Sequence, residues 1–282
     1  MTNFSAQRIF ELKKIANKIR QNIISMIFEA GSGHPAGSLG MADIFTALYF
    51  EILKHDPKNP DDPDRDRLIL SNGHICPVQY ASLAHAGYFP VEDLQTLRKF
   101  GSGLQGHPHR GFLPGIETTS GPLGCGLSEA CGMAWVGKND NKDWKVYCLM
   151  SDAEGQEGNT WEAVMFANKY KLNNLIAVID RNNIQTDGTV EDVMPLNSLK
   201  KKYQAFGWAV AEIDGHNFEE ILGAFEEAKD LAVAGPSLII ANTIPGKGVS
   251  FMENKFEWHS HKISKEEMEK ALTELREEIL HG

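Results

Sequence analysis

The chain has 282 residues, of which 42% are hydrophobic and 23% charged, and its formal net charge is −10. This is the composition of an ordinary globular protein, and the length suffices for a hydrophobic core without disulfide or metal support. The acidic balance argues against general binding to nucleic acids or anionic membranes, because both carry dense negative charge.

The first hundred residues are predicted to be mostly helical. Apolar residues recur every three to four positions from residue 5 to 29, which predicts a long amphipathic helix that ends at the Gly- and Pro-containing segment 31–35. After this segment we expect helices at 41–52, after His74 and at 91–100, with a short strand at 68–70.

The remaining two thirds begin with a loop and then alternate between helices and strands. Residues 101–124 are rich in Gly, Pro and His, and a long loop of this kind usually carries function. We expect helices at 126–138, 160–170, 196–206, 218–231 and 263–280, and strands at 146–150, 175–179, 208–213 and 237–242. This alternation predicts an α/β fold, a doubly wound, mostly parallel sheet with helices on both faces.

No linker or internal repeat divides the chain. We therefore expect residues 1–282 to form a single domain with an N-terminal helical extension. The four cysteines form no Cys-x-x-Cys pair, and the polar N-terminus lacks the apolar stretch of a secretory signal. No apolar run approaches the roughly 18 residues of a membrane span. These features predict free thiols, a cytoplasmic location and no membrane segment.

Polar residues follow two consecutive predicted strands. Asp152 comes just after the first of these strands, and Asn182 comes just after the second. The carboxyl ends of parallel strands meet at one edge of a sheet, where ligands of such folds bind. A carboxylate and a carboxamide oxygen form half of a Mg²⁺ site that a diphosphate and water can complete.

Structural interpretations of the same residues remain open at this stage. Asp152 could cap the following helix, and Asn182 could form an Asx turn. The Gly-His-Pro segments at 33–35 and 106–108 could be ordinary turns, and His74 could cap the helix after it. The paired placement of Asp152 and Asn182 favours the metal site.

The order of several motifs carries a specific resemblance. SDAEGQEG at 151–158, followed by KLNNLIAVIDRNNIQTDG at 171–188, resembles the thiamine-diphosphate motif in its transketolase form. The same order holds for GSGHPAGSLG (31–40), LSNGHICPVQY (70–80), GHP (106–108), PGIETTSGPLGCGLSEACGMA (114–134) and WH (258–259). Over about residues 8–270, the chain resembles the N-terminal, diphosphate-binding part of a transketolase, which implies the thiamine-diphosphate-binding fold.

The resemblance implies a set of residues for thiamine diphosphate and its metal. Mg²⁺, or Ca²⁺ or Mn²⁺ in its place, would be held by Asp152, Asn182 and the backbone carbonyl of Ile184. The diphosphate would meet His74 and the backbone amide of Ala153, and Asn182 would also belong to the cofactor set. The turn Gly121, Pro122 and Leu123 would meet the aminopyrimidine ring.

The resemblance also implies catalytic residues. His34, His107 and His259 resemble the histidines around the thiazolium carbon, which bind sugar hydroxyls and move protons; His259 would touch the cofactor as well. Imidazole suits this role because it donates and accepts hydrogen bonds near neutral pH. Glu157 and Glu162, grouped with the cofactor set, resemble acidic residues at the dimer interface between two active sites.

Three departures from the family pattern qualify the resemblance. The sequence has Ser-Asp-Ala where the family has Gly-Asp-Gly, but Ala153 keeps its backbone N–H. Two histidines lie close together near the end; His259 is preferred because Trp258 precedes it, and His261 is the second choice. The chain also contains no second α/β run for the pyrimidine-binding domain, which holds the cofactor-activating glutamate and the arginines that bind sugar phosphate.

The implied protein is therefore the N-terminal subunit of a split transketolase. In an assembly with two copies of each chain, it would work together with a separate C-terminal subunit. The pair would transfer a two-carbon ketol unit from a ketose phosphate to an aldose phosphate. Two alternatives stay open: a subunit of a 2-oxo acid decarboxylating or deoxyxylulose-phosphate-synthase-like enzyme, and a non-catalytic cofactor-binding relative.

Overall fold

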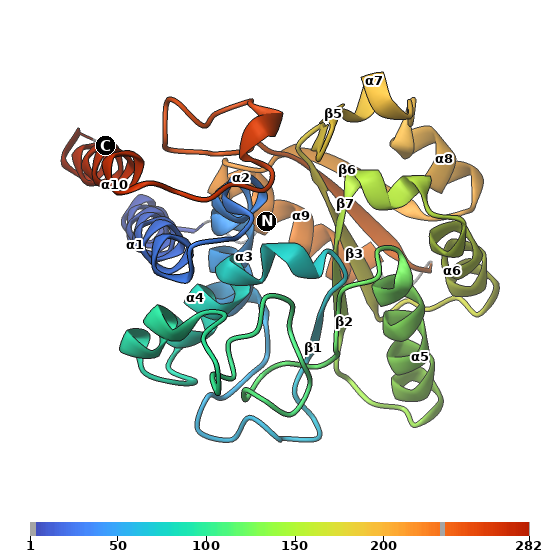
Figure 1. The fold of residues 1–282 in the computed structure, drawn as a ribbon. Coiled ribbons are helices and arrows are strands. Elements are labelled where there is room, and N and C mark those ends of the chain that lie inside the picture. Colours follow the sequence, from blue (N-terminus) through green and yellow to red (C-terminus); the bar gives the residue numbers. More distant parts are fainter. Residues whose placement is uncertain (1–3, 232–234, 282) are drawn as a thin grey trace.

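A five-stranded parallel sheet forms the centre of the molecule (Figure 1). The computed structural model describes residues 4–231 and 235–281. In spatial order the strands are β1 (Arg67–Leu70), β2 (Val146–Ser151), β3 (Leu175–Arg181), β7 (Ser237–Asn242) and β6 (Ala209–Asp214). All neighbours pair in parallel, so the predicted fold class is confirmed.

The strands are apolar on both faces because helices cover both faces. In β2, Tyr147 and Leu149 belong to one hydrophobic core, whereas Val146 and Cys148 belong to the other. The period of two along a strand sends successive side chains to opposite faces. This double burial explains why the strands read as continuous apolar runs in the sequence.

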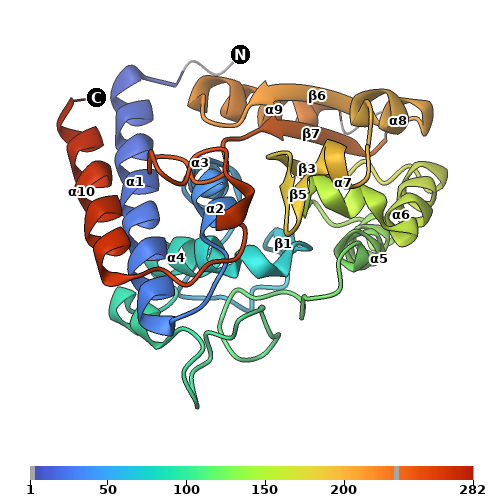
Figure 2. The same cartoon turned by 45° about the horizontal axis from the view of Figure 1, so that its top comes forward.

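The helices form unequal layers on the two faces. On one face lie α2 (Pro35–Gly40), α3 (Ala42–Ala47), α4 (Cys76–Ala86) and α9 (Phe218–Leu231), backed by α1 (Ala6–Ala30) and α10 (Lys265–His281). On the other face lie α5 (Cys125–Asn139), α6 (Gly158–Lys169) and α8 (Leu199–Ala205). The helices α1 and α10, from opposite ends of the chain, lie side by side (Figures 1 and 2). None of the helices in the described residues has the length and apolar character to span a bilayer.

A buried ion pair connects α1 to the loops that follow β6 and β7. Arg20 of α1 binds the Asp43 carboxylate with two nitrogens, at 3.1 and 2.5 Å. The Nδ1 atom of His216 donates to Asp43 Oδ2 at 2.8 Å, because its Nε2 accepts the backbone N–H of Ile244 at 2.8 Å. The loop after β7 is therefore held to α1 through one carboxylate.

The predicted elements are mostly present, with differences at three places. The helix expected at 41–52 begins earlier, as α2 at Pro35, and ends in a π-helical turn at Leu48–Ile52. The helix expected at 196–206 is present but shorter, as α8 (Leu199–Ala205), and a separate short helix, α7 (Val190–Val193), precedes it. The prediction of a helix over 91–100 is wrong, because the segment forms a shorter 3-10 helix, Val91–Thr96. Its two buried side chains, Leu94 and Leu97, are three residues apart, which suits a 3-10 turn.

The packing of α5 on the end of β1 leads to a stability prediction. A Cβ atom at Gly126 would lie 2.5 Å from Ser71 Cβ and 2.7 Å from Ser71 Cα, whereas one at Gly132 of the same helix meets nothing within 4 Å. We expect Gly126→Ala to lower the free energy of unfolding by about 1–3 kcal/mol through overpacking. Gly132→Ala, the matched control, should raise it by about 0.5–1 kcal/mol. Denaturant titration compares them; equal effects would contradict the packing argument.

Candidate active site

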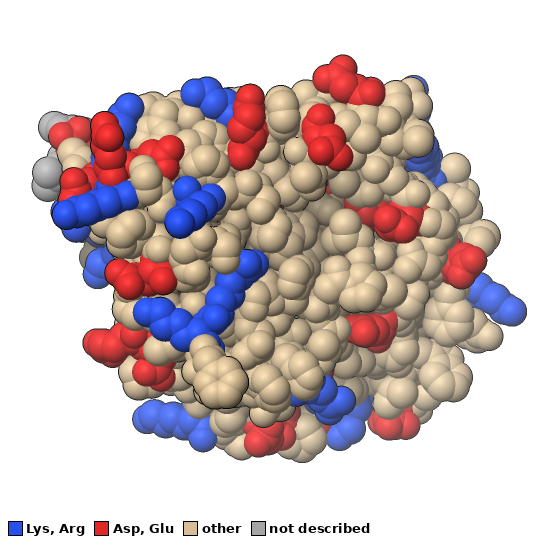
Figure 3. Space-filling view, viewed as in Figure 1, with Lys and Arg blue, Asp and Glu red and all other residues tan. Residues whose placement is uncertain are grey.

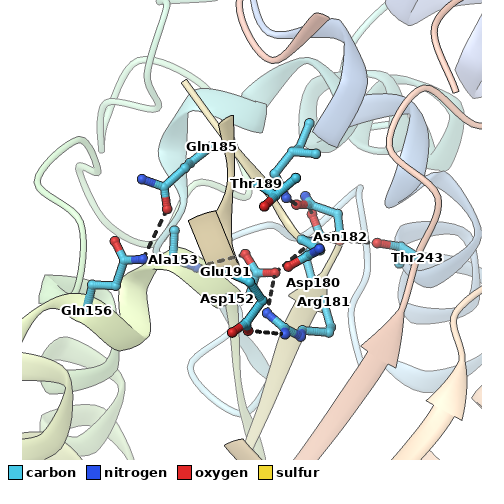
Figure 4. Close-up of polar contacts among 12 residues, drawn as sticks. Asp152, Ala153, Gln156, Asp180, Arg181, Asn182, Gln185, Thr189, Glu191 and Thr243 are labelled. Atoms are coloured by element: carbon cyan, nitrogen blue, oxygen red, sulfur yellow. Dashed lines mark hydrogen bonds and ion pairs between the residues drawn. The ribbon is translucent and has the colours of Figure 1, made fainter. Parts of the chain in front are cut away.

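The carboxyl ends of β1, β2, β3 and β7 bring their following residues to one edge of the sheet. Because Ser151 of β2 pairs with Asp180 of β3, the residues just after these strands are neighbours. The contact is direct: the backbone N–H of Asn183 donates to Asp152 Oδ2 at 2.8 Å. Figure 4 shows Asp152, which follows β2, beside Arg181 and Asn182 from the end of β3. The structure thus brings together the two segments that the sequence paired.

Asp152 is fully buried and richly hydrogen-bonded. Its Oδ1 accepts the N–H of Ala153 at 2.8 Å, and its Oδ2 accepts Arg181 Nη1 at 3.1 Å. Burial raises the pKa of Asp152 to about 6, although these hydrogen bonds and the Arg181 charge oppose the shift. The helix-cap interpretation is wrong, because α6 begins only at Gly158 and Asp152 starts a separate 3-10 turn, Asp152–Gln156.

The side chain of Asn182 is fixed by bonds at both ends. Its Nδ2 donates to Asp180 Oδ2 at 2.7 Å, and its Oδ1 accepts the N–H of Ile184 at 3.0 Å. The second bond is the Asx turn expected as the structural alternative. A carboxamide oxygen has two lone pairs, so the turn leaves one of them for a cation. Asp180 in turn accepts Thr243 Oγ1, from the end of β7, and therefore sets which way the carboxamide faces.

Four histidines gather beside this edge. The ring centroid of His34 lies 5.1 Å from that of His74, 6.5 Å from that of His107 and 5.5 Å from that of His259. The ring of His259 also lies 5.1 Å from that of His74. Each ring comes from a different part of the chain. His34 ends the segment 31–34, His74 follows β1, His107 lies in the long loop, and His259 lies in the segment after β7. The interpretation of residues 101–124 as a functional loop therefore agrees with where His107 lies.

His261 lies outside this cluster. Its ring packs on Trp258 at 4.1 Å, and its side chain faces Glu267. Its backbone N–H donates to the Gly33 carbonyl at 3.1 Å, which ties the segment of His259 to that of His34. Of the two candidates, the geometry thus places His259 among the other histidines.

Burial keeps the clustered imidazoles neutral. It lowers the pKa of His34 to about 4, helped by the charges of His259, Arg98 and His107. It also lowers the pKa values of His74, His107 and His259. Neutral imidazole carries one N–H donor and one acceptor nitrogen, which is what binding a hydroxyl or moving a proton requires.

A buried carboxylate supports the turn at 121–123. Glu154 accepts the Gly124 N–H at 2.7 Å and the Ser151 N–H at 2.8 Å, and it also accepts Ser71 Oγ. One side chain therefore joins the end of β1, the end of β2 and the turn. Ser120, just before the turn, packs against Gly73, since a Cβ there would lie 2.8 Å from Ser120 Cβ. The turn Gly121, Pro122 and Leu123 thus begins beside His74.

The two predicted interface glutamates lie at the start of α6 and along it. Glu157 adjoins the turn, because a Cβ at Gly124 would lie 2.9 Å from its Cβ. Glu162 is exposed on α6. The helices α5 and α6 also carry exposed apolar side chains toward their C-terminal ends: Trp135, Val136, Met165, Phe166 and Tyr170.

Comparison with known proteins decides the family. The sequence matches the family described as transketolase, thiamine diphosphate binding domain, over residues 12–278. The chain belongs to the transketolase family.

Its relatives include both short subunits and long enzymes. It is 45% identical to the 6-deoxy-6-sulfo-D-fructose transketolase subunit of Clostridium sp. strain MSTE9, with 97% of this chain and 99% of the relative covered. A subunit of the apulose-4-phosphate transketolase of Phocaeicola vulgatus is 42% identical, with 94% of this chain and 93% of the relative covered.

Longer relatives match only in part. Human transketolase is 38% identical over 97% of this chain, and the chain spans 43% of its length. The crystal structure of Campylobacter jejuni transketolase superposes with a TM-score of 0.88 at 37% identity, over 94% of this chain and 42% of that one. The predicted family, the transferase class and the cofactor thiamine diphosphate are therefore confirmed, and this chain is a transketolase subunit of the N-terminal type.

The polar groups at the strand ends fit a transketolase cofactor. In the described part of the chain, the buried His34 Nδ1, both polar atoms of the Asn72 side chain and Ser120 Oγ have no hydrogen-bond partner. Buried polar groups without protein partners need a bound molecule or water.

The donor set also fits a cation completed by phosphate. Within residues 4–231 and 235–281, no three His, Cys, Asp or Glu side chains gather into a metal cage. The Asn183 N–H on Asp152 and the Ile184 N–H on the Asn182 oxygen place these two side-chain oxygens at adjoining strand ends. Mg²⁺ accepts such a sparse set, because it usually keeps waters and binds phosphate oxygens.

Sequence reasoning missed three residues of this transketolase site. Glu154 was readable in principle, because Ser151-x-x-Glu154 is a capping-box pattern. Asp180 lies near the end of the apolar strand β3, and a carboxylate at the carboxyl end of a buried strand indicates a polar site there. Arg181, whose Nη2 binds Glu191 at 2.9 Å while Nη1 binds Asp152, gave no signal, because its partners are set only by the fold.

The neutral histidines can be tested directly. At pH 5.5 a histidine with the usual pKa of about 6.5 is roughly tenfold more protonated than neutral. His34, with a pKa of about 4, should still be neutral at that pH. Nitrogen-15 NMR of the imidazoles, assigned with His34→Asn, would show its tautomer, and the denatured chain supplies the reference. Titration of His34 near 6.5 in the folded chain would contradict the burial argument.

Proposed function

We propose that this chain transfers a two-carbon ketol unit from a ketose phosphate to an aldose phosphate, together with a separate partner subunit. In this proposal residues 1–282 act as one diphosphate-binding domain in the cytoplasm. The observation that carries the proposal is the cluster of four histidine rings at the sheet edge that also holds the buried Asp152 and the side chain of Asn182.

The protein's part in the reaction follows from this geometry. Bound thiamine diphosphate supplies the electron sink that ketose cleavage requires. His34, His107 and His259 would bind sugar hydroxyls and hold or move protons at their ring nitrogens, as neutral imidazoles do. His74 and the Ala153 N–H would bind the diphosphate, and the turn 121–123 would orient the pyrimidine end.

The metal belongs to the same proposal. Asp152, Asn182 and the Ile184 carbonyl would hold Mg²⁺ beside the diphosphate, with Asp180 keeping the Asn182 oxygen toward the ion. The contacts of Asn182 Nδ2 with Asp180 and of Oδ1 with Ile184 support this orientation. Orienting contacts of this kind to metal ligands are common in metal sites.

The partner would supply the other half of the active site. We propose a C-terminal subunit that carries the pyrimidine-binding domain, with its activating glutamate and phosphate-binding arginines, in an assembly of two copies of each chain. Exposed aromatic and Met side chains on α5 and α6, the second of which carries Glu162, support burial of this face, because apolar surface of this kind marks interaction sites. Both short relatives are named as subunits of a transketolase.

The substrate class is a sugar with an anionic group. The two short relatives are named for a sulfo sugar and a phosphorylated sugar. The proposal for this chain therefore extends to ketoses that carry phosphate or sulfonate.

The function is tested by reconstitution. The chain, mixed with the product of a neighbouring reading frame of the pyrimidine-domain type, should transfer the ketol unit when thiamine diphosphate and Mg²⁺ are added. Neither protein should do so alone, because each holds half of the site. Product sugars are measured by chromatography and mass spectrometry. Release of CO₂ from a 2-oxo acid without ketol transfer would favour the decarboxylase alternative.

The metal assignment is tested by Asp152→Asn. Loss of the charged ligand should weaken thiamine diphosphate and Mg²⁺ binding by more than roughly 100-fold, since even orienting contacts around metal ligands are worth 10- to 100-fold. Calorimetry measures the affinity. Asp64→Asn is the matched control, because Asp64 is exposed and pairs with Lys142. Unchanged cofactor affinity in Asp152→Asn would refute the assignment.

A further inference from the structure

Arg98 is a cation beside the histidine cluster that the proposed mechanism does not use. It follows the 3-10 helix Val91–Thr96, and its backbone has a φ of 59°, in the left-handed region. The backbone N–H of Arg98 donates to the Leu104 carbonyl at 2.8 Å. A left-handed conformation at a residue other than glycine is strained, and such residues cluster at functional sites.

The guanidinium lies between the segments that carry two of the histidines. Its Nη1 donates to Ser32 Oγ at 3.0 Å, two residues before His34. A Cβ atom at Gly106, next to His107, would lie 2.9 Å from Arg98 Nε and 3.1 Å from Cζ. The side chain therefore packs on the glycine before His107 while it bonds the serine near His34. Its charge also lowers the pKa of both histidines.

Within the described residues, Arg98 forms no ion pair. By contrast, four other arginines bind carboxylates: Arg8, Arg20, Arg65 and Arg181. Arg98 also lines a surface hollow of about 800 Å³ together with Lys99 and Gln105, so a ligand can reach it from solvent. On the face drawn in Figure 3, Lys and Arg side chains reach toward a central hollow. A planar cation with free donors suits the geometry of phosphate and sulfonate oxygens.

We propose that Arg98 is a specificity-determining residue that binds the terminal phosphate or sulfonate of the sugar substrate. The proposal deepens the proposed ketol transfer and rests on it. A sugar whose hydroxyls bond to His34 and His107 has its far end within reach of a cation that adjoins both segments. Arg98 would act in addition to the phosphate-binding groups of the partner subunit.

The kinetic test compares matched acceptors. With the reconstituted complex and L-erythrulose as donor, kcat/KM is measured for erythrose 4-phosphate and for erythrose. In Arg98→Ala the ratio of the two values should fall roughly 10- to 100-fold, mainly through KM, as expected for loss of a charge-assisted hydrogen bond. Arg98→Lys should recover part of the ratio, because it keeps the charge.

Two controls separate recognition from a structural role. Lys142→Ala removes a positive charge that pairs with Asp64 at 2.8 Å and does not line this hollow, and it should leave the ratio unchanged. Ser32→Ala removes the contact that braces the two segments. If Arg98 only braces these segments, Arg98→Ala and Ser32→Ala will lower kcat/KM equally for erythrose 4-phosphate and for erythrose. The ratio of the two values will then stay the same, and this result would overturn the proposal.

A binding measurement keeps the proposal testable without activity. The full chain, loaded with thiamine diphosphate and Mg²⁺, is titrated with inorganic phosphate at constant ionic strength while the imidazole NMR signals of His34 and His107 are followed. These signals should shift in the wild-type chain and lose most of the shift in Arg98→Ala. Equal shifts in both, or none in the wild type, overturn the role of Arg98. Failure of ketol transfer alone would count against the proposed function instead.

Discussion

The parallel pairing of four strands is the constraint on which the site depends. Since β1, β2, β3 and β7 run in one direction, their carboxyl ends open at one edge, and residues far apart in the chain become neighbours there. Each of these strands is buried on both faces, so polar side chains can enter only where the strands end. Ser71, Asp152, Asn182 and Thr243 all occupy such positions.

Buried carboxylates at this edge are tolerated because each is held by several donors. Asp152, Glu154 and Asp180 each accept at least two hydrogen bonds, from backbone N–H groups or from side chains of adjoining elements. Burying a charge without partners is costly, so these networks also fix how the strand ends lie relative to one another. The histidines follow the opposite rule, since burial without a carboxylate partner keeps them neutral.

Much of the fold and part of the site could be predicted from local pattern. Continuous apolar runs between amphipathic helices identified every strand of the sheet, and motif order identified the four clustered histidines. The prediction of a helix over 91–100 failed because the spacing of apolar residues does not distinguish a 3-10 turn from an α-helix over so few residues. Glu154, Asp180 and Arg98 escaped because their importance comes from tertiary contacts: a capping pattern, a strand end and an arginine in a loop all look ordinary until the fold supplies their neighbours.

The pairing of His34 with His259 has a consequence for how the protein is made. The two residues stand more than 200 positions apart, yet their rings lie close together, and the segment of His259 is tied to that of His34 through the His261 N–H and the Gly33 carbonyl. Contacts of such long sequence separation form late, because chain closure must precede them. During synthesis from the N-terminus, the sheet edge is therefore completed only once the last quarter of the chain has left the ribosome, so a truncated product would lack the histidine cluster.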